Sequence, residues 1–422
     1  MSQPKYKNPP PVFMLEMIDQ GYAVARELAT YGIPIIGFLP PGPCIESHSR
    51  IASKICRFPE KDEERVASML RLKKEFAPHK PVLILSSEAH IPFLYRNRKV
   101  LETHFAFELP EEGKMQTMLE KDLFSAFARK HHILIPASLE LSNKQPITAE
   151  TFEGQPFPMV VKPKIRDHNW KRTYKSQKAF LARSPTEALN LCRRLLKTAD
   201  RLVAQEWIPG PDRNIHFCLT YLCRDGEALD TVCGIKLQQH PPLFGNTAAA
   251  ITREVDEVTQ ETLRLLRAAE VCGFCSVEFK QHAHNGRFYV IEPTVGRMNR
   301  QELFSMLGQH RLVLAAYCRL SGLPMPASPG TSKPFIYVEE GLDIKSSLDY
   351  QHYGAMNWKE WFSSLTSRQI RPMFISSKDP LVSLLTLAGV LKHLGYYLFK
   401  GRTRHFYEDP TLRELIHLNQ NN

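Results

Sequence analysis

Two short apolar runs, residues 276–280 and 287–292, constrain the fold most, because a polar turn with Asn285-Gly286 joins them. This pattern predicts a β-hairpin. Each run carries a glutamate, Glu278 or Glu292. An antiparallel pair would place the two carboxylates side by side on one face, where like charges repel. A divalent cation between them would relieve the repulsion, and Mg²⁺ prefers carboxylate and phosphate oxygens. The alternative is two exposed carboxylates on a solvated hairpin.

Earlier segments supply other parts of a nucleotide site. Residues 157–163 form a short apolar strand that ends near Lys162, whose ammonium could contact phosphate oxygens. Residues 202–212 predict a strand that turns sharply at Pro209-Gly210. The backbone from Glu206 to Ile208 would then be free to bind an adenine edge, and Asp212 could accept hydrogen bonds from ribose. Upstream, Lys121 lies at the start of an amphipathic helix that ends before residues 133–136.

In this order the segments resemble the ATP-grasp superfamily. More narrowly, they are similar to D-aspartate-ligase-like carboxylate–amine ligases, a branch related to biotin carboxylase and D-alanine–D-alanine ligase. The order and spacing of several motifs carry the resemblance, which covers about residues 10–325. The motifs are ILIP at 133–136, VVKP at 160–163, QEWIPGPD at 205–212, VEF at 277–279 and IEPTVGR at 291–297.

The resemblance implies an α/β and α+β architecture in three parts. A Rossmann-like pre-ATP-grasp domain would cover residues 1–113, and an ATP-grasp domain residues 114–330, with its two lobes meeting at 202/203. Residues 331–422 would form a helical C-terminal extension. The residues themselves predict strands at 12–15, 33–38 and 82–85 alternating with helices at 22–30 and 63–76, a pattern typical of a parallel α/β domain.

The resemblance also implies a reaction and its residues. ATP phosphorylates a substrate carboxylate, and an amine then attacks the acyl phosphate to form an amide. ATP and Mg²⁺ are the expected cofactors, and the partners are a small carboxylate and a small amine. The implied roles are Mg²⁺ ligands for Glu278 and Glu292, phosphate or adenine contacts for Lys162 and Lys121, adenine contacts for Gln205, Glu206 and Ile208, a ribose contact for Asp212, and contacts with the acyl phosphate for Arg297 and Lys236.

Two departures from the family pattern keep a second hypothesis open. Thr294 stands where the superfamily usually has a metal-binding asparagine, so Asn299 is the candidate for the missing oxygen. The segment after Lys162 normally carries glycines that close over the phosphates, but none occurs between Gly154 and Gly210. Side chains could close it instead, namely Arg166, His168, Asn169 and Lys171. The second hypothesis is an ATP-binding module with impaired catalysis, and a third is a carboxylase that uses bicarbonate.

Composition limits the partners and the compartment. The net charge is +11, yet no basic stripe interleaved with aromatic residues predicts nucleic-acid binding. ATP and an acidic substrate would account for the densest basic cluster, from Lys162 to Arg183, and a solvated basic loop is the alternative for the lysines beyond Arg172. The cluster includes Lys164, Arg166, Lys171, Arg172, Lys175 and Lys178. The nine cysteines form no disulfide framework, and no signal peptide is visible, so we expect a cytoplasmic protein.

The C-terminal region contains an apolar run at residues 380–391, which continues at helical spacing and is followed by Lys400, Arg402 and Arg404. The run is too short to span a bilayer. It could lie on an anionic membrane surface, on the inner face. Alternatively, it docks on the protein's own core or on a partner. The sequence leaves the oligomeric state and the identity of both substrates open.

Overall fold

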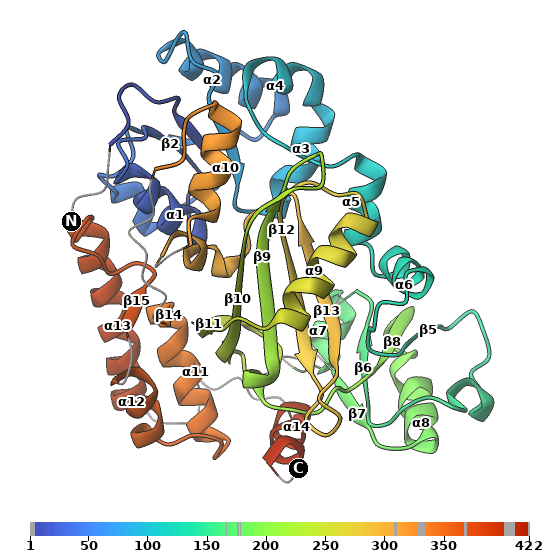
Figure 1. Ribbon diagram of the computed structural model, residues 1–422. Coiled ribbons are helices and arrows are strands. Elements are labelled where there is room, and N and C mark those ends of the chain that lie inside the picture. Colours follow the sequence, from blue (N-terminus) through green and yellow to red (C-terminus); the bar gives the residue numbers. More distant parts are fainter. Residues whose placement is uncertain are drawn as a thin grey trace.

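The computed structural model describes residues 5–420, except 166, 175–176, 178, 308–309, 327–333, 367–368 and 401–409. Arg166, Lys175, Lys178, Arg402 and Arg404 therefore lie outside the described residues. Within the described part, three β-sheets follow one another along the chain (Figure 1).

The N-terminal sheet is parallel, with the strand order β3-β2-β1-β4. β1 and β4 are buried along their whole length, as is typical of a parallel sheet covered on both faces. The strands predicted at 12–15, 33–38 and 82–85 are therefore present. The elements are β1 (Val12–Leu15), α1 (Gln20–Ala29), β2 (Ile35–Leu39), β3 (Lys54–Arg57), α2 (Asp62–Lys74), β4 (Val82–Leu85), η2 (Glu88–His90), α3 (Ile91–Arg96) and α4 (Arg98–His104).

The next sheet is antiparallel, with the order β5-β8-β6-β7. The segment after Lys162 is not a loop throughout, because it forms the short helix α7. Trp170 of this helix is fully buried in the core of the lobe, which anchors the turn. The elements are α5 (Glu112–Leu119), α6 (Lys121–Lys130), β5 (Ser138–Ser142), β6 (Met159–Pro163), α7 (His168–Tyr174), β7 (Phe180–Ala182), α8 (Pro185–Leu195) and β8 (Arg201–Glu206).

The largest sheet has the order β13-β12-β9-β10-β11-β14-β15 and is antiparallel except for the last pair. α9 packs on one face of it, and η5 and α10 pack on the other. The elements are β9 (Ile215–Leu222), β10 (Ala228–His240), β11 (Asn246–Thr252), α9 (Asp256–Ala268), β12 (Gly273–Gln281), β13 (Phe288–Val295), η5 (Arg300–Met306) and α10 (Leu312–Ser321).

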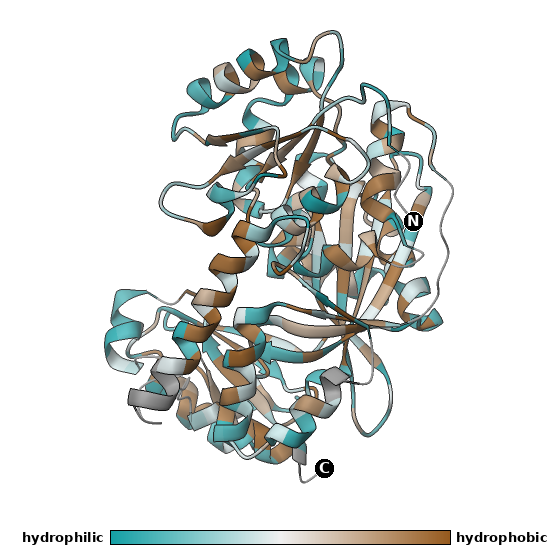
Figure 2. Cartoon of the chain, turned by 90° about the vertical axis from the view of Figure 1, so that its left-hand side faces the viewer, coloured by the Kyte–Doolittle hydropathy of each residue, from teal (hydrophilic) through white to brown (hydrophobic). Residues whose placement is uncertain are grey.

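The C-terminal segment continues this sheet. β14 lies between β11 and β15, so these two strands belong to the sheet of the second lobe. The boundary at residue 330/331 stays a prediction. Figure 2 looks onto the side of the molecule where the helices at residues 340–352, 358–366 and 380–400 lie. The described chain contains no helix long and apolar enough to cross a membrane. The elements are β14 (Phe335–Val338), α11 (Glu340–His352), α12 (Trp358–Thr366), β15 (Gln369–Pro372), α13 (Pro380–Lys400) and α14 (Pro410–Gln420).

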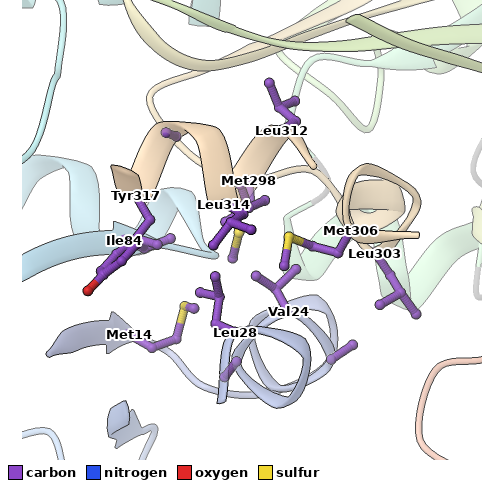
Figure 3. Packing of buried hydrophobic residues seen from close by; sticks show 14 of the residues in the cluster. Met14, Val24, Leu28, Ile84, Met298, Leu303, Met306, Leu312, Leu314 and Tyr317 are labelled. Carbon is purple, nitrogen blue, oxygen red and sulfur yellow. The ribbon is translucent and has the colours of Figure 1, made fainter. Parts of the chain in front are cut away.

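One hydrophobic core joins the N-terminal sheet to the second lobe. Met14 and Ile84 come from the parallel sheet and Val24 from α1, and they pack with Leu303 of η5 and Leu314 of α10 (Figure 3). All five are at most 1% exposed. The carboxyl ends of β1 and β4 are thereby held against the strands that carry the two glutamates.

Candidate active site

β12 and β13 form the predicted hairpin, and Glu278 pairs directly with Glu292. Ile291 is the extra residue of a β-bulge beside this pair. Because side chains alternate along a strand, Ser276 and Thr294, the pair two residues away, lie on the same face. The strand register therefore confirms the expectation that Glu278 and Glu292 lie side by side.

Glu278 is held by two neighbours. The Lys236 ammonium on β10 donates to Glu278 Oε2 at 2.7 Å, and the Gln301 amide donates to Oε1 at 3.1 Å. Glu278 is 8% exposed and Lys236 5%. Neither is therefore a solvated surface residue, and the predicted contact residue Lys236 lies at the carboxylate pair.

Glu292 lacks such neighbours. In the described part of the chain, no hydrogen-bond donor or cation contacts its carboxylate. Glu292 is exposed, whereas Glu278 is buried. Protein atoms around the Glu292 carboxylate nevertheless remove part of its hydration. Burial first, and the charge of Glu278 second, raise its pKa above the usual range, although the charges of Lys236 and Arg297 oppose this. A half-enclosed carboxylate with a like charge beside it fits a cation-binding position.

Lys162 lies near the charges of both Glu292 and Lys121. Lys162 donates to Gln205 Oε1 at 3.2 Å, which joins two predicted nucleotide contacts. Burial first, and the nearby charge of Lys121 second, lower the pKa of Lys162 to about 8, while the charge of Glu292 opposes the shift. The first lobe therefore brings Lys162, with Lys121 near it, close to Glu292 of the second lobe.

The strand end after β8 offers one amide for recognition. The Glu206 amide donates to Ala137 O at 2.8 Å and the Trp207 amide to Pro158 O at 2.9 Å. Among the described residues, no acceptor contacts the amide of Ile208, which is buried. The Glu206 carboxylate accepts from the Ala137 amide and stabilises this corner. This arrangement is consistent with an adenine contact through the Ile208 backbone.

Asp212 is buried and already bonded. Gln239 donates to it twice, through its side-chain and backbone nitrogens at 2.9 Å each, and the Tyr350 hydroxyl donates as well. Lys280 donates to the carbonyls of Gly210 and Pro211 at 2.6 and 2.7 Å. Asp212 and Lys280 thus fix the turn between the lobes. The ribose contact predicted for Asp212 stays a prediction.

Arg297 follows β13 and faces the N-terminal sheet. Its guanidinium lies 3.5 Å from Glu88 Oε2, and it donates to Met298 O at 3.1 Å. Glu88 belongs to η2, directly after β4, at the carboxyl end of the parallel sheet. Ligands of open α/β sheets bind at this end. Arg300 lies nearby and pairs with Asp19 at 3.3 Å and with Glu339.

A groove of about 1260 Å³ lies elsewhere on the molecule. Ile235 and Leu237 line it, and these residues flank Lys236 on β10. Because side chains alternate along a strand, this groove opens on the face of the sheet opposite the glutamates. It is therefore not part of the site described above.

No protein-family model matches the sequence, and no curated protein matches it. Solved structures do match. N5-carboxyaminoimidazole synthetase from Staphylococcus aureus, complexed with ADP, is 13% identical with a TM-score of 0.57, over 84% of this chain and 88% of that one. Phosphoribosylglycinamide synthetase from Anaerococcus prevotii is 14% identical with a TM-score of 0.52, over 77% and 79%.

A third match is the biotin carboxylase domain of the Hydrogenobacter thermophilus 2-oxoglutarate carboxylase, in complex with MgADP, ADP and bicarbonate. It is 13% identical with a TM-score of 0.55, over 78% of this chain and 74% of that one. The fold is the ATP-grasp fold. This confirms the fold class that the motifs implied. At these identities the likeness concerns the fold, and the roles of individual residues stay predictions.

Within this ATP-grasp fold, Asn299 lies beside the carboxylate pair. Its side-chain nitrogen donates to Ser276 Oγ at 2.6 Å, while its oxygen accepts from the Arg300 amide at 2.6 Å and caps η5. Glu302 accepts from the Asn299 amide, and burial raises the pKa of Glu302 to about 7. The oxygen proposed for a metal is therefore used by the cap, and its metal contact stays a prediction.

The donor set fits Mg-ATP. Glu278 and Glu292 supply hard oxygens, and Lys162 and Lys121 supply cations for phosphate groups. Bound Mg²⁺ would neutralise charge on the phosphate oxygens. Gln301 and Lys280 were missed by the sequence reasoning. Gln301 lies in η5, a short 3₁₀ helix that no sequence pattern predicted. Lys280, at alternate spacing from Glu278, could have been suspected.

Proposed function

We propose that this protein is an ATP-dependent carboxylate–amine ligase. The observation that carries the proposal is Glu292, which has no partner among the described residues, pairs with Glu278 across the hairpin and lies near the charges of Lys162 and Arg297. Charged groups gathered in one cleft with shifted pKa values are typical of a working site. The nine cysteines are all free, which supports a reducing compartment such as the cytoplasm.

The proposed reaction has two balanced steps. A carboxylate oxygen of the acid attacks the γ-phosphorus of ATP, which gives an acyl phosphate and ADP. The amine then attacks the acyl carbon, phosphate leaves, and the nitrogen loses one proton. Phosphorylation is needed because an unactivated carboxylate would have to expel oxide or hydroxide.

The protein contributes position and charge. Lys162 and Lys121 would hold phosphate oxygens from the first lobe. Arg297, at the carboxyl end of the N-terminal sheet, would bind the substrate carboxylate through its planar guanidinium. Lys236 would hold Glu278 in place and balance its charge, as their 2.7 Å ion pair does in the structure.

A screen with hydroxylamine tests the proposal without knowledge of the natural amine. Hydroxylamine traps an acyl phosphate as a hydroxamate, so each candidate acid can be scored by hydroxamate and ADP together. The acids include acidic amino acids, uronic acids, peptidoglycan precursors and bicarbonate. We expect at least one acid to give both products, Glu292→Gln to give neither, and the exposed control Glu153→Gln to match the wild type.

The second candidate is an ATP-binding module without catalysis. Thr294 favours it, because this buried threonine stands where the superfamily usually has a metal-binding asparagine. If ATP binds with Mg²⁺ but no acid yields ADP or hydroxamate, the ligase proposal is wrong and the second candidate stands. ADP released with bicarbonate alone would instead indicate a carboxylase.

A further inference from the structure

α13 has two unlike faces, and one of them docks on the protein. Val382, Ser383 and Thr386 are buried. Just before the helix, Asp379 accepts hydrogen bonds from the hydroxyls of Tyr22 at 3.1 Å and Ser49 at 2.5 Å. These contacts fix the start of α13 on the N-terminal domain, so the direction of its other face is set.

The opposite face is an exposed apolar stripe. Leu384, Leu387 and Leu391 are 63%, 42% and 66% exposed. Their spacing of three and four residues aligns them along one side of a helix. α13 lies on the side of the molecule that Figure 2 turns to the viewer, and apolar residues recur along it. Isolated exposed leucines need no explanation, but a stripe on a fixed helix indicates a binding surface.

The charged residues of α13 itself are all basic. Residues 380–400 contain no aspartate or glutamate, and Lys392 is exposed directly after Leu391. The sequence continues with Lys400, Arg402 and Arg404. α12 contacts α11 through a hydrogen bond from Trp361 to Asp343, and α13 also packs on α11. The exposed face of α12 carries further aromatic side chains, Trp358 at 42% and Phe362 at 56%.

We propose that the leucine stripe of α13 binds an anionic lipid surface, with the helix lying in the plane of the interface. The leucines would enter the boundary between head groups and acyl chains, and Lys392 would contact the negative head groups. Tryptophan prefers the same depth. A second copy of the chain fits less well, because a two-fold contact between identical stripes would bring the same cations together.

Vesicle co-sedimentation tests this proposal with the full chain. The probes are phosphatidylcholine vesicles with and without 30% phosphatidylglycerol (a chosen mixing ratio of roughly one third, enough for a negative surface potential). We expect binding to the anionic vesicles that weakens as salt increases. The triple variant Leu384→Glu/Leu387→Glu/Leu391→Glu should bind at least about ten-fold more weakly. Lys392→Ala should bind about five-fold more weakly.

A matched control adds the same charges elsewhere. Val100, Leu119 and Met325 are exposed to a similar degree, and we expect Val100→Glu/Leu119→Glu/Met325→Glu to bind anionic vesicles like the wild type. The proposal is overturned if the wild type stays in the supernatant, or if the stripe variant and the control lose binding equally. It is also overturned if the stripe variant alone converts a wild-type dimer into a monomer in sedimentation without lipid.

Discussion

The two glutamates of the hairpin show how neighbours give the same residue type different properties. Glu278 forms an ion pair with Lys236 and accepts a hydrogen bond from the side-chain amide of Gln301. Glu292, directly opposite, has no such partner among the described residues, and its pKa is raised by burial and by Glu278. The free carboxylate, rather than the paired one, is therefore the position where a cation would contribute most.

Lys162 gives a prediction on pH. Burial first, and Lys121 second, place the pKa of Lys162 at about 8, so it loses its proton in the range where ordinary lysines stay charged. If Lys162 holds phosphate, ATP affinity should fall about ten-fold between pH 7 and pH 9. Lys162→Arg should bind ATP with little change over this range, because arginine stays charged. Titration calorimetry at each pH measures this, and an identical pH profile for both proteins would refute the assignment.

For single residues, the sequence was sufficient to predict the features that depend on neighbours along the chain. The Asn-Gly turn and strand alternation were sufficient to place Glu278 opposite Glu292. The hydrogen-bond partners of the site residues were harder to predict from the sequence. Gln301 reaches Glu278 from a separate 3₁₀ helix, and Tyr350 reaches Asp212 across 138 residues of chain. Such contacts depend on tertiary packing that no local pattern encodes.

Among the elements, α14 has the least expected position. Leu415 packs with Val160 of β6 and with Trp207, while Ile416 packs near Phe244 of the second lobe. Asn419 accepts a hydrogen bond from the Gly210 amide at 3.0 Å, in the turn between the lobes. The C-terminal helix therefore supports the strand end that carries the proposed adenine contacts.

This position predicts an effect on nucleotide binding. Leu415→Ala removes buried side-chain volume, which typically costs about 3 kcal/mol, and should loosen α14. Asn419→Ala leaves the Gly210 amide without its acceptor. We expect both variants to raise KM for ATP several-fold with a smaller change in kcat. His417→Ala, on the exposed side of the same helix, is the control and should behave like the wild type. Equal kinetics for all three variants would show that α14 does not support the site.

Periodic patterns identified most of the elements, although not their arrangement. The apolar run at 380–391 was correctly expected to be helical. Whether it docks on the protein or lies on a membrane surface was left open by the sequence. β14 and β15 are four residues each, and β15 is exposed along most of its length. Short strands with little alternation resemble loops, so their addition to the large sheet could not be predicted from the sequence.

In the whole molecule, the C-terminal segment contacts every other part. Lys378 pairs with Glu27 of α1 at 2.7 Å, and Arg183 of the first lobe pairs with Glu414 at 3.0 Å. Arg26 donates to Met373 O at 2.7 Å from a buried position. β14 meanwhile adds a buried strand to the second lobe. These contacts predict that the segment is required for the stability of the whole chain.

Two truncations test this. A chain that ends at residue 330 lacks β14, which uncovers β11 and the apolar core around it, so we expect it to aggregate or to unfold without a cooperative transition. A chain that ends at residue 400 lacks α14 alone and should unfold cooperatively, a few degrees below the wild type. Thermal unfolding followed by circular dichroism distinguishes them. A cooperative transition of the shorter chain at the wild-type temperature would show that residues 331–422 are an independent extension.

The central claim is that Glu278 and Glu292 hold Mg²⁺ against bound ATP. Calorimetric titration of ATP with Mg²⁺ and with EDTA, on the wild type and on Glu292→Gln, tests it most directly. For the wild type we expect Mg²⁺ to tighten ATP binding at least about ten-fold. Glu292→Gln should bind ATP equally with and without Mg²⁺, while its unfolding temperature stays the same or rises, because the repulsion from Glu278 is removed. A Glu292→Gln protein that responds to Mg²⁺ as the wild type does would contradict the account.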